Sequence, residues 1–125
     1  IGAEDDFYPE EIKDIILAVL EKSLSEIEPQ SRRYDIVTNI LRSNKHHSIR
    51  EKKIEQLKHA LKSSSKMTPH ILQELKDIGF EISEDGKHYK LTYFGDARYT
   101  IALAKTPSDY RSGQNNISII TKTVF

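Results

Sequence analysis

The sequence predicts an α+β protein: a helical amino-terminal part followed by an α-β-β-β-α module with a three-stranded antiparallel sheet. Three observations support this fold class. Apolar residues recur at helical spacing in the first half of the chain. Two later runs alternate polar and apolar residues, which is the period of a strand. A polar serine run at 63–65 separates the part with helical spacing from the part with strand alternation. We therefore expect a three-helix region at residues 1–65 and the module at residues 66–125.

Three helices are expected in the first region. The first begins with Pro9 in its first turn and ends near Pro29. The second spans about 31–43, and the third starts at an S-x-x-E capping box made by Ser48 and Glu51. We expect Ile16→Asp to unfold this bundle, because an unpaired buried charge is costly. The helices should pack on one another through Ile12, Ile16, Val19, Ile36, Ile40, Ile54, Leu57 and Leu61.

The module is expected to open with a helix and continue with three strands. Thr68 is placed to cap the helix, Pro69 suits its first position, and Gly79 suits its end. The strands are predicted at 80–83, 87–94 and 98–104, and a closing helix at 115–124. Period-2 alternation sets the register. It predicts that Tyr89, Leu91, Ile101 and Leu103 are more buried than Lys90, Thr92 and Thr100.

Composition limits the classes of function. Nineteen basic residues balance nineteen acidic ones, which argues against a strongly basic nucleic-acid binder but leaves room for a local basic face. The chain has no cysteine, so we expect no disulfide, zinc ribbon or thiol nucleophile. It has no apolar run long enough for a membrane helix, and we expect a cytoplasmic protein. Because Ile1 is not a start methionine, we also expect the chain to be part of a larger parent protein.

The second half of the chain resembles a known family. Residues 71–80 look like the opening helix of the HicA-like small bacterial toxins, which ends in a glycine and an aromatic residue, here Gly79 and Phe80. The sequence Gly86-Lys87-His88 sits where that family typically carries Gly-Ser-His on its second strand. The resemblance covers about residues 68–125. It implies a fold like that of double-stranded-RNA-binding domains, and it places the family's catalytic histidine at His88.

The candidate site residues follow from the predicted sheet. Histidine can act as a general base near neutral pH, for instance on an RNA 2′-hydroxyl. Basic residues on or beside one sheet face would neutralise phosphates. We expect no cofactor and no metal, because the adjacent His46 and His47, with His59, make a poor tetrahedral site. The predicted nucleic-acid-binding set is Lys87, His88, Lys90, Arg98, Lys105 and Arg111.

Three functions remain open from the sequence. The preferred one is an accessory nucleic-acid-binding domain of a larger bacterial-type protein, without efficient catalysis, in which RNA and DNA are equally possible ligands. The second is a metal-independent HicA-type ribonuclease that uses His88 as general base. The third is a protein-interaction or dimerisation module built on the helical part, with an undetermined oligomeric state. A winged helix over residues 31–94 is an alternative architecture.

Overall fold

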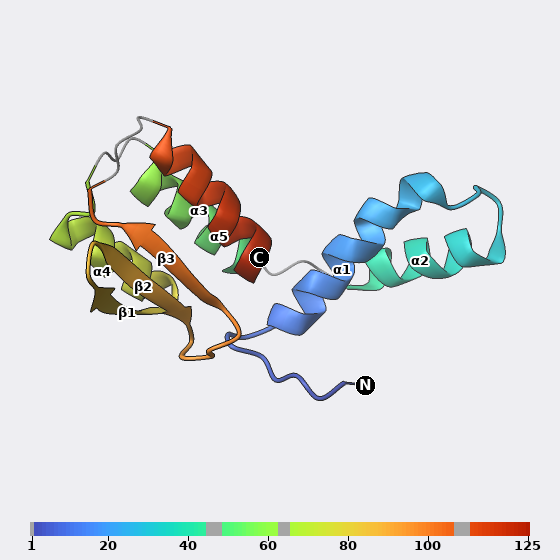
Figure 1. Cartoon of the computed structure of the whole chain (residues 1–125). Helices are drawn as coiled ribbons and strands as arrows, with labels where there is room; N and C mark the ends of the chain where they lie inside the picture. The colour runs from blue at the N-terminus through green and yellow to red at the C-terminus, as the bar shows by residue number, and fades with distance from the viewer. Residues whose placement is uncertain (1, 45–48, 63–65, 107–110) are drawn as a thin grey trace. The chain divides into compact units, whose positions relative to one another are not determined.

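The computed structural model describes residues 2–44, 49–62, 66–106 and 111–125 (Figure 1). Helices and a single three-stranded antiparallel sheet confirm the predicted α+β class. The chain divides into two compact units, Ile1–Arg50 and Glu51–Phe125, called here the helical unit and the sheet unit. In chain order the elements are α1 (Glu11–Ser23), the 3-10 helix η1 (Leu24–Glu26), α2 (Arg32–Ser43), α3 (Ile49–Leu61), α4 (Pro69–Ile78), β1 (Phe80–Asp85), β2 (His88–Tyr93), β3 (Thr100–Ala104) and α5 (Ser112–Val124).

The sheet unit is built on a β1-β2-β3 meander. In its register Ile82 pairs with Leu91, and Leu91 pairs with Ile101. Leu91, Ile101 and Leu103 are buried, while Lys90 and Thr100 are exposed, so the predicted register is confirmed for these residues. Tyr89 and Thr92 are both half-buried, so the expected contrast between them is absent.

The core of the sheet unit lies between one face of the sheet and the helices α3, α4 and α5 (Figure 1). Tyr93 anchors an aromatic cluster, with its ring 5.0 Å from Phe80, 4.8 Å from Phe94 and 5.8 Å from Phe125, measured between centroids. The largest fully buried aliphatic side chains of this unit are Leu57, Leu61, Leu75, Ile78, Leu91, Leu103 and Ile120. Because all three helices contribute to this set, the opposite face of the sheet is left to solvent.

Two local signals in the sheet unit act as expected. The Thr68 hydroxyl accepts a hydrogen bond from the Ile71 N–H at 3.2 Å and caps α4. Gly79 ends that helix with φ 133°, a conformation that favours glycine, and its N–H donates to the Leu75 and Lys76 carbonyls. Its carbonyl then accepts from the Phe94 N–H at 2.8 Å. The end of α4 is therefore tied directly to the end of β2.

The helical unit is a hairpin of α1 and α2 (Figure 1). Ser31 caps α2, accepting from the Tyr34 N–H at 3.2 Å. Pro9 lies before α1 and not in its first turn, which corrects the sequence prediction. The reason is that Glu10 takes a positive φ of 68°, so the helix begins only at Glu11.

The predicted three-helix bundle is wrong. Its first two helices leave much of their stripe in solvent, with Ile16, Val19, Ile36 and Ile40 exposed by 47%, 59%, 42% and 37%. In the third, Leu57 and Leu61 are buried within the sheet unit. An apolar stripe predicts that one side of a helix is buried, but it does not identify the element that covers it. For this reason the sequence prediction placed α3 in the wrong core. Since Ile16 is half exposed, Ile16→Asp is no longer expected to unfold the chain.

The division into units falls at Arg50 and Glu51, whereas we expected a boundary at 65/66. The serine run at 63–65 and the capping residue Ser48 lie outside the described residues. The winged-helix alternative is not supported, because α2 belongs to the helical unit and a third strand completes the sheet. None of the helices in the described part of the chain is long and apolar enough to cross a membrane.

Candidate nucleic-acid interface

The open face of the sheet carries small and polar side chains. The strand register places Ser83, Lys90 and Ala102 in one row across this face, and Asp85, His88 and Ala104 in the next. Thr92 and Thr100 continue it, with their hydroxyl oxygens 3.4 Å apart. Glu81, which pairs with Thr92, and Lys90 add one long acidic and one long basic side chain to this face.

A hollow of about 520 Å³ opens at one end of this sheet. Its lining comes from the β1–β2 turn, the start of β2 and the end of β3: Gly86, Lys87, His88, Ala104, Lys105 and Thr106. Gly86 takes φ 59° in the tight turn, a conformation that favours glycine. The Lys105 N–H donates to the Lys87 carbonyl at 2.9 Å and holds the two chain segments together. We call these six residues the hairpin-end hollow.

Two lysines in the hairpin-end hollow differ in their surroundings. Lys105 places its Nζ 3.4 Å from Glu84 Oε1 and 5.2 Å from the centroid of the Tyr89 ring. Lys87 is exposed, and no ion pair joins it to the rest of the described chain. The carboxylate of Glu84 therefore offsets the charge of Lys105, while the charge of Lys87 is available to a ligand.

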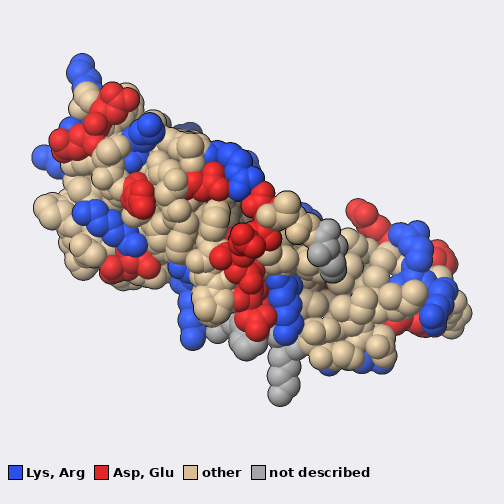
Figure 2. All heavy atoms as spheres, turned by 90° about the horizontal axis from the view of Figure 1, so that it is seen from below, with Lys and Arg blue, Asp and Glu red and all other residues tan. Residues whose placement is uncertain are grey.

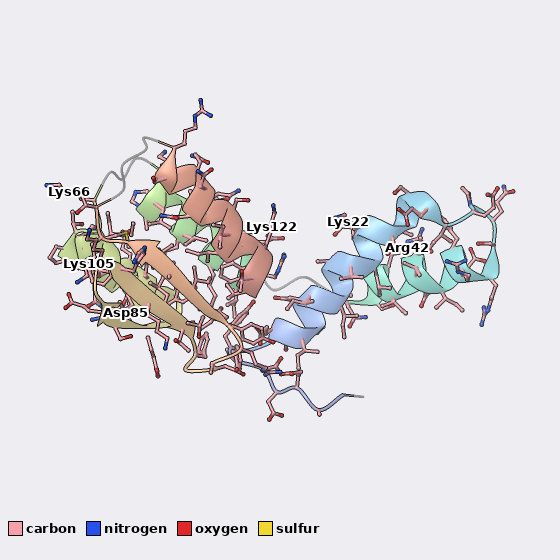
Figure 3. The ribbon with its side chains drawn as sticks, in the orientation of Figure 1. Lys22, Arg42, Lys66, Asp85, Lys105 and Lys122 are labelled. Carbon is pink, nitrogen blue, oxygen red and sulfur yellow. The ribbon has the colours of Figure 1, made fainter. Side chains whose placement is uncertain are left out.

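Sequence reasoning missed Lys66, which joins the same end of the sheet. The Met67 N–H donates to the Lys105 carbonyl at 3.5 Å, and this contact brings the segment before α4 beside the end of β3. Figure 3 shows Lys66 and Lys105 at that end. Lys66 lies before the predicted first helix of the module, and it belongs to no motif or periodic run in the sequence. Only the pairing across the fold could have revealed it.

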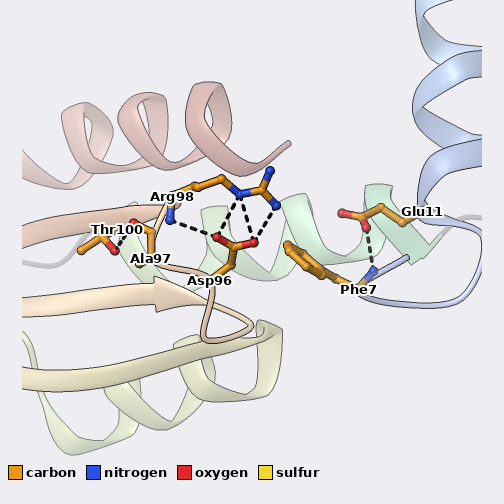
Figure 4. Close-up of polar contacts among 6 residues, drawn as sticks. All are labelled: Phe7, Glu11, Asp96, Ala97, Arg98 and Thr100. Atoms are coloured by element: carbon orange, nitrogen blue, oxygen red, sulfur yellow. Dashed lines mark hydrogen bonds and ion pairs between the residues drawn. The ribbon is translucent and has the colours of Figure 1, made fainter. Parts of the chain in front are cut away.

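The structure separates the other predicted cations from the hollow. Lys90 lies on the open face two residues along β2 from His88, roughly 7 Å away. Arg98 was expected on the third strand, but β3 begins only at Thr100, and Arg98 lies in the turn at the opposite end of the sheet. There its guanidinium binds the Asp96 carboxylate, with a shortest contact of 2.7 Å (Figure 4). Arg111 stands at the start of α5 and does not line the hollow.

The Asp96–Arg98 pair also affects the acidity of its carboxyl. The side-chain and backbone hydrogen bonds from Arg98 hold the pKa of Asp96 below its usual value. Asp96 is therefore ionised at neutral pH, and it competes with any phosphate for Arg98. This removes Arg98 from the set of cations that a ligand can use freely.

His88 is exposed on the open face at the rim of the hollow. Its neighbour across the β1–β2 ladder is Asp85, but no hydrogen bond or ion pair joins these side chains in the described structure. A general base usually works with a group that orients its ring. The register places His88 on the open face and places Glu84 and Tyr89, which contact Lys105, on the other face, so Lys105 and His88 approach the hollow from opposite sides of the sheet end. Proton transfer at His88 would require a partner supplied by the ligand or by Asp85.

The surface charge of the sheet unit is mixed. On the face seen in Figure 2, basic and acidic side chains are both present, and acidic ones gather in one band near the middle of the view. At this end of the sheet, Glu84 and Asp85 accompany Lys66, Lys87 and Lys105. Among the described residues no group of three or more histidine or acidic side chains is arranged to hold a metal. His46 and His47 lie outside them, and His59 faces Glu74, Nδ1 to Oε1, at 3.7 Å.

Comparison of the chain with protein-family models, with curated proteins and with solved structures gave no match. The resemblance of residues 68–125 to HicA-like toxins therefore stays a prediction.

A second group of ionisable side chains lies at the start of α1 in the helical unit. Tyr8, Glu11 and Asp14 are buried, and Glu11 Oε1 accepts from the Phe7 N–H at 2.8 Å (Figure 4). Burial and the neighbouring carboxylates, partly offset by Arg50, raise the pKa of Tyr8 to about 12. These side chains hold the segment before α1 in place, and the raised pKa of Tyr8 makes the folding of the helical unit sensitive to high pH.

We expect the helical unit to lose stability as the pH rises from about 10 towards about 12. Tyr8 keeps its proton longer in the folded state than in the unfolded state, whose pKa is near 10, so its contribution is full below that pH and is lost above it. The free energy of unfolding should fall by at most about 1.4 kcal/mol per pH unit. Urea unfolding of the wild type and Tyr8→Phe, followed by circular dichroism at about pH 9 and about pH 11, measures it. If the free energy of unfolding depends on pH equally in the wild type and in Tyr8→Phe, the raised pKa of the buried Tyr8 is contradicted.

Proposed function

We propose that the sheet unit binds the phosphate backbone of a nucleic acid, as an accessory domain of a larger protein. One observation carries this proposal. The pairing of β2 with β3 brings Lys105, at the end of β3, beside Lys87 and His88, at the start of β2, around one exposed hollow at the end of the sheet. The α-β-β-β-α order also agrees with what the HicA-like resemblance implies.

The chemistry of the hairpin-end hollow suits phosphate oxygens. Lysine ammonium groups bind phosphate as point charges, and the histidine ring adds a hydrogen-bond donor. The adjoining face presents Ser83, Ala102 and the Thr92–Thr100 pair around Lys90, which adds a third cation, while the Glu81 carboxylate opposite Thr92 limits this path along β2. Such contacts read the backbone and not the base sequence.

The expected affinity is modest. Glu84 and Asp85 lie at the same end of the sheet and repel phosphate, and the whole chain has no net charge. Non-specific nucleic-acid binding at physiological salt typically has a Kd of about 10⁻⁴ to 10⁻⁶ M. The wild type should fall in or above this range, with a larger parent protein supplying further affinity.

We predict that Lys87→Ala weakens binding and lowers its salt dependence. Each lost phosphate contact should reduce the log–log salt slope by about 0.7 for single strands and about 0.9 for duplexes. Fluorescence anisotropy with labelled single- and double-stranded RNA and DNA at several salt concentrations measures both quantities. Lys122→Ala is the matched control, because Lys122 is an exposed lysine of the same unit that lies away from Lys105 (Figure 3). Absence of binding to all four ligands at low salt would refute the proposal.

His88 distinguishes binding from catalysis at the same hollow. If the hollow only binds, His88→Ala should change the affinity little, and the RNA should stay intact. If the domain is a metal-independent ribonuclease, the wild type should cut RNA in the presence of a chelator, and His88→Ala should lose on the order of 100-fold or more in rate. Cleavage that depends on His88 would show that the domain is a ribonuclease and would refute the proposal of a non-catalytic accessory domain.

A further inference from the structure

The outer edge of β3 presents backbone groups that no described residue binds. β3 is the last strand of the sheet, and β2 is its only neighbour. The Lys105 N–H donates to the Lys87 carbonyl at 2.9 Å, so the odd-numbered residues of this strand turn their backbone groups towards β2. The N–H and C=O groups of Thr100, Ala102 and Ala104 therefore point outwards. No hydrogen bond from elsewhere in the described part of the chain reaches them.

β3 also lacks the features that normally protect the edge of a sheet. Exposed edge strands usually carry a charge, a proline or a bulge, which discourages another strand from pairing with them. β3 has the sequence Thr-Ile-Ala-Leu-Ala, and it pairs with β2 residue by residue without a bulge. The opposite edge differs, because β1 carries Glu81, Glu84 and Asp85. Of the two edges, that of β3 is therefore the one suited to accept another strand.

The side chains of β3 are arranged symmetrically about Ala102. Small side chains at Thr100, Ala102 and Ala104 lie on the open face, whereas Ile101 and Leu103 are buried on the helix side. An antiparallel copy of β3 centred on Ala102 sets Ala102 opposite itself and Thr100 opposite Ala104, so the outward backbone groups meet in register. On the helix side the same register sets Ile101 opposite Leu103. The strand thus matches its own reversed copy in hydrogen bonding, size and polarity.

The charges that flank β3 do not oppose this pairing. The register would bring Lys105 of one copy towards Arg98 of the other, where two free cations would repel each other. Each is offset within its own chain. The Lys105 Nζ lies 3.4 Å from Glu84 Oε1, and the Arg98 guanidinium contacts the Asp96 carboxylate at 2.7 Å. An uncharged strand between two ion-paired flanks can therefore meet a second copy without net repulsion.

We propose that two copies of this chain join through their β3 edges, in an antiparallel pairing centred on Ala102. The contact is isologous, so each outward residue exchanges both of its backbone hydrogen bonds with the residue opposite. The two sheets then form one continuous six-stranded sheet, with both open faces on the same side. Because the contact is confined to the edge of one short strand, the dimer is weak and forms reversibly. It does not depend on whether the open face binds a nucleic acid.

The test is the molar mass of the full chain in solution. Sedimentation equilibrium over a range of concentrations should show a reversible dimer. Ala102→Lys and Ala102→Glu should each raise the dimer Kd several-fold at low salt, because like charges would face each other across about 5.5 Å between Cα atoms. An equimolar mixture of these two variants should dimerise more tightly than either alone, since opposite charges then meet. Ser83→Lys is the matched control: it adds a charge to the same row of the open face, but on β1, and should leave the Kd unchanged.

A proline variant tests the backbone hydrogen bonds themselves. Ala102→Pro removes an outward N–H and keeps the bonds to β2, because Ala102 and Lys90 form a non-hydrogen-bonded pair. Proline is tolerated on an edge strand but not between two strands, so the dimer Kd should rise on the order of 10-fold or more, with an unchanged circular dichroism spectrum.

Two results would overturn the proposal. A wild-type chain that stays monomeric at every concentration leaves the β3 edge to an extended segment of another protein. A dimer that none of the Ala102 variants weakens, or a mixture of the lysine and glutamate variants that is no tighter than its components, shows that the copies do not pair through Ala102.

Discussion

Leu57→Asp is expected to abolish folding of the sheet unit. Leu57 lies in α3 with no exposed surface, in the same unit as the sheet. An aspartate there would lose the apolar contacts of leucine and bury a charge without a partner. The cost should exceed about 4 kcal/mol, which is most of the stability of a small domain. Thermal and urea unfolding followed by circular dichroism should show that the transition of the sheet unit is lost under conditions where the wild type is folded.

The control for this experiment is Ile119→Asp. It introduces the same charge into another helix of the same unit, at a side chain that is half exposed, so its cost should stay within about 1 kcal/mol. If the Leu57→Asp protein keeps an unchanged sheet transition, then α3 does not belong to the core of the sheet unit. The comparison therefore tests directly the division of the chain at Arg50 and Glu51.

Gly113→Ala is expected to destabilise the chain although it replaces a glycine within a helix. On helical propensity alone the change would stabilise α5 by roughly 1 kcal/mol. In the fold, however, a Cβ at this position would overlap the carbonyl oxygen of Leu61 at the end of α3. Backbone cannot move aside as a flexible side chain can, so the helices must separate, at a cost of about 1–3 kcal/mol. We expect the steric effect to exceed the propensity gain and to lower the urea midpoint.

The sign of the change is the measurement that matters here. Ser118→Ala, at an exposed position of the same helix, meets no such contact and should raise the midpoint slightly through propensity alone. A Gly113→Ala protein as stable as the wild type would show that α5 does not approach the end of α3 so closely. Comparison of the two alanine variants at constant m-value separates packing from propensity.

Part of the candidate site was predictable because strand periodicity is local. The alternation around Leu91 is sufficient to place Lys90 on the solvent face, and the strand register and the exposure of Lys90 confirm this position. The gathering of Lys87 with Lys105 required the register between β2 and β3, which follows from the length of the loop joining them. That loop holds Arg98 and was predicted as strand, because its residues continue the alternating pattern. The bond from Arg98 to Asp96 is a local turn contact that periodicity cannot reveal.

By itself the sequence determined most of the helices and strands, except the loop that holds Arg98 and the start of α1, and it determined which side of each element is apolar. These properties depend on neighbours within a few residues, such as the Thr68 cap, the Gly79 stop and the alternation along β2. Only the tertiary structure decided where each apolar side is buried. The stripes of α1, α2 and α3 look alike in sequence, yet α3 enters the core beneath the sheet, while Ile16 and Ile36 remain exposed. The physical reason is that the hydrophobic effect is not directional. Burial against any apolar surface is stabilising, and which surface covers a given helix depends on shape and packing across the whole fold.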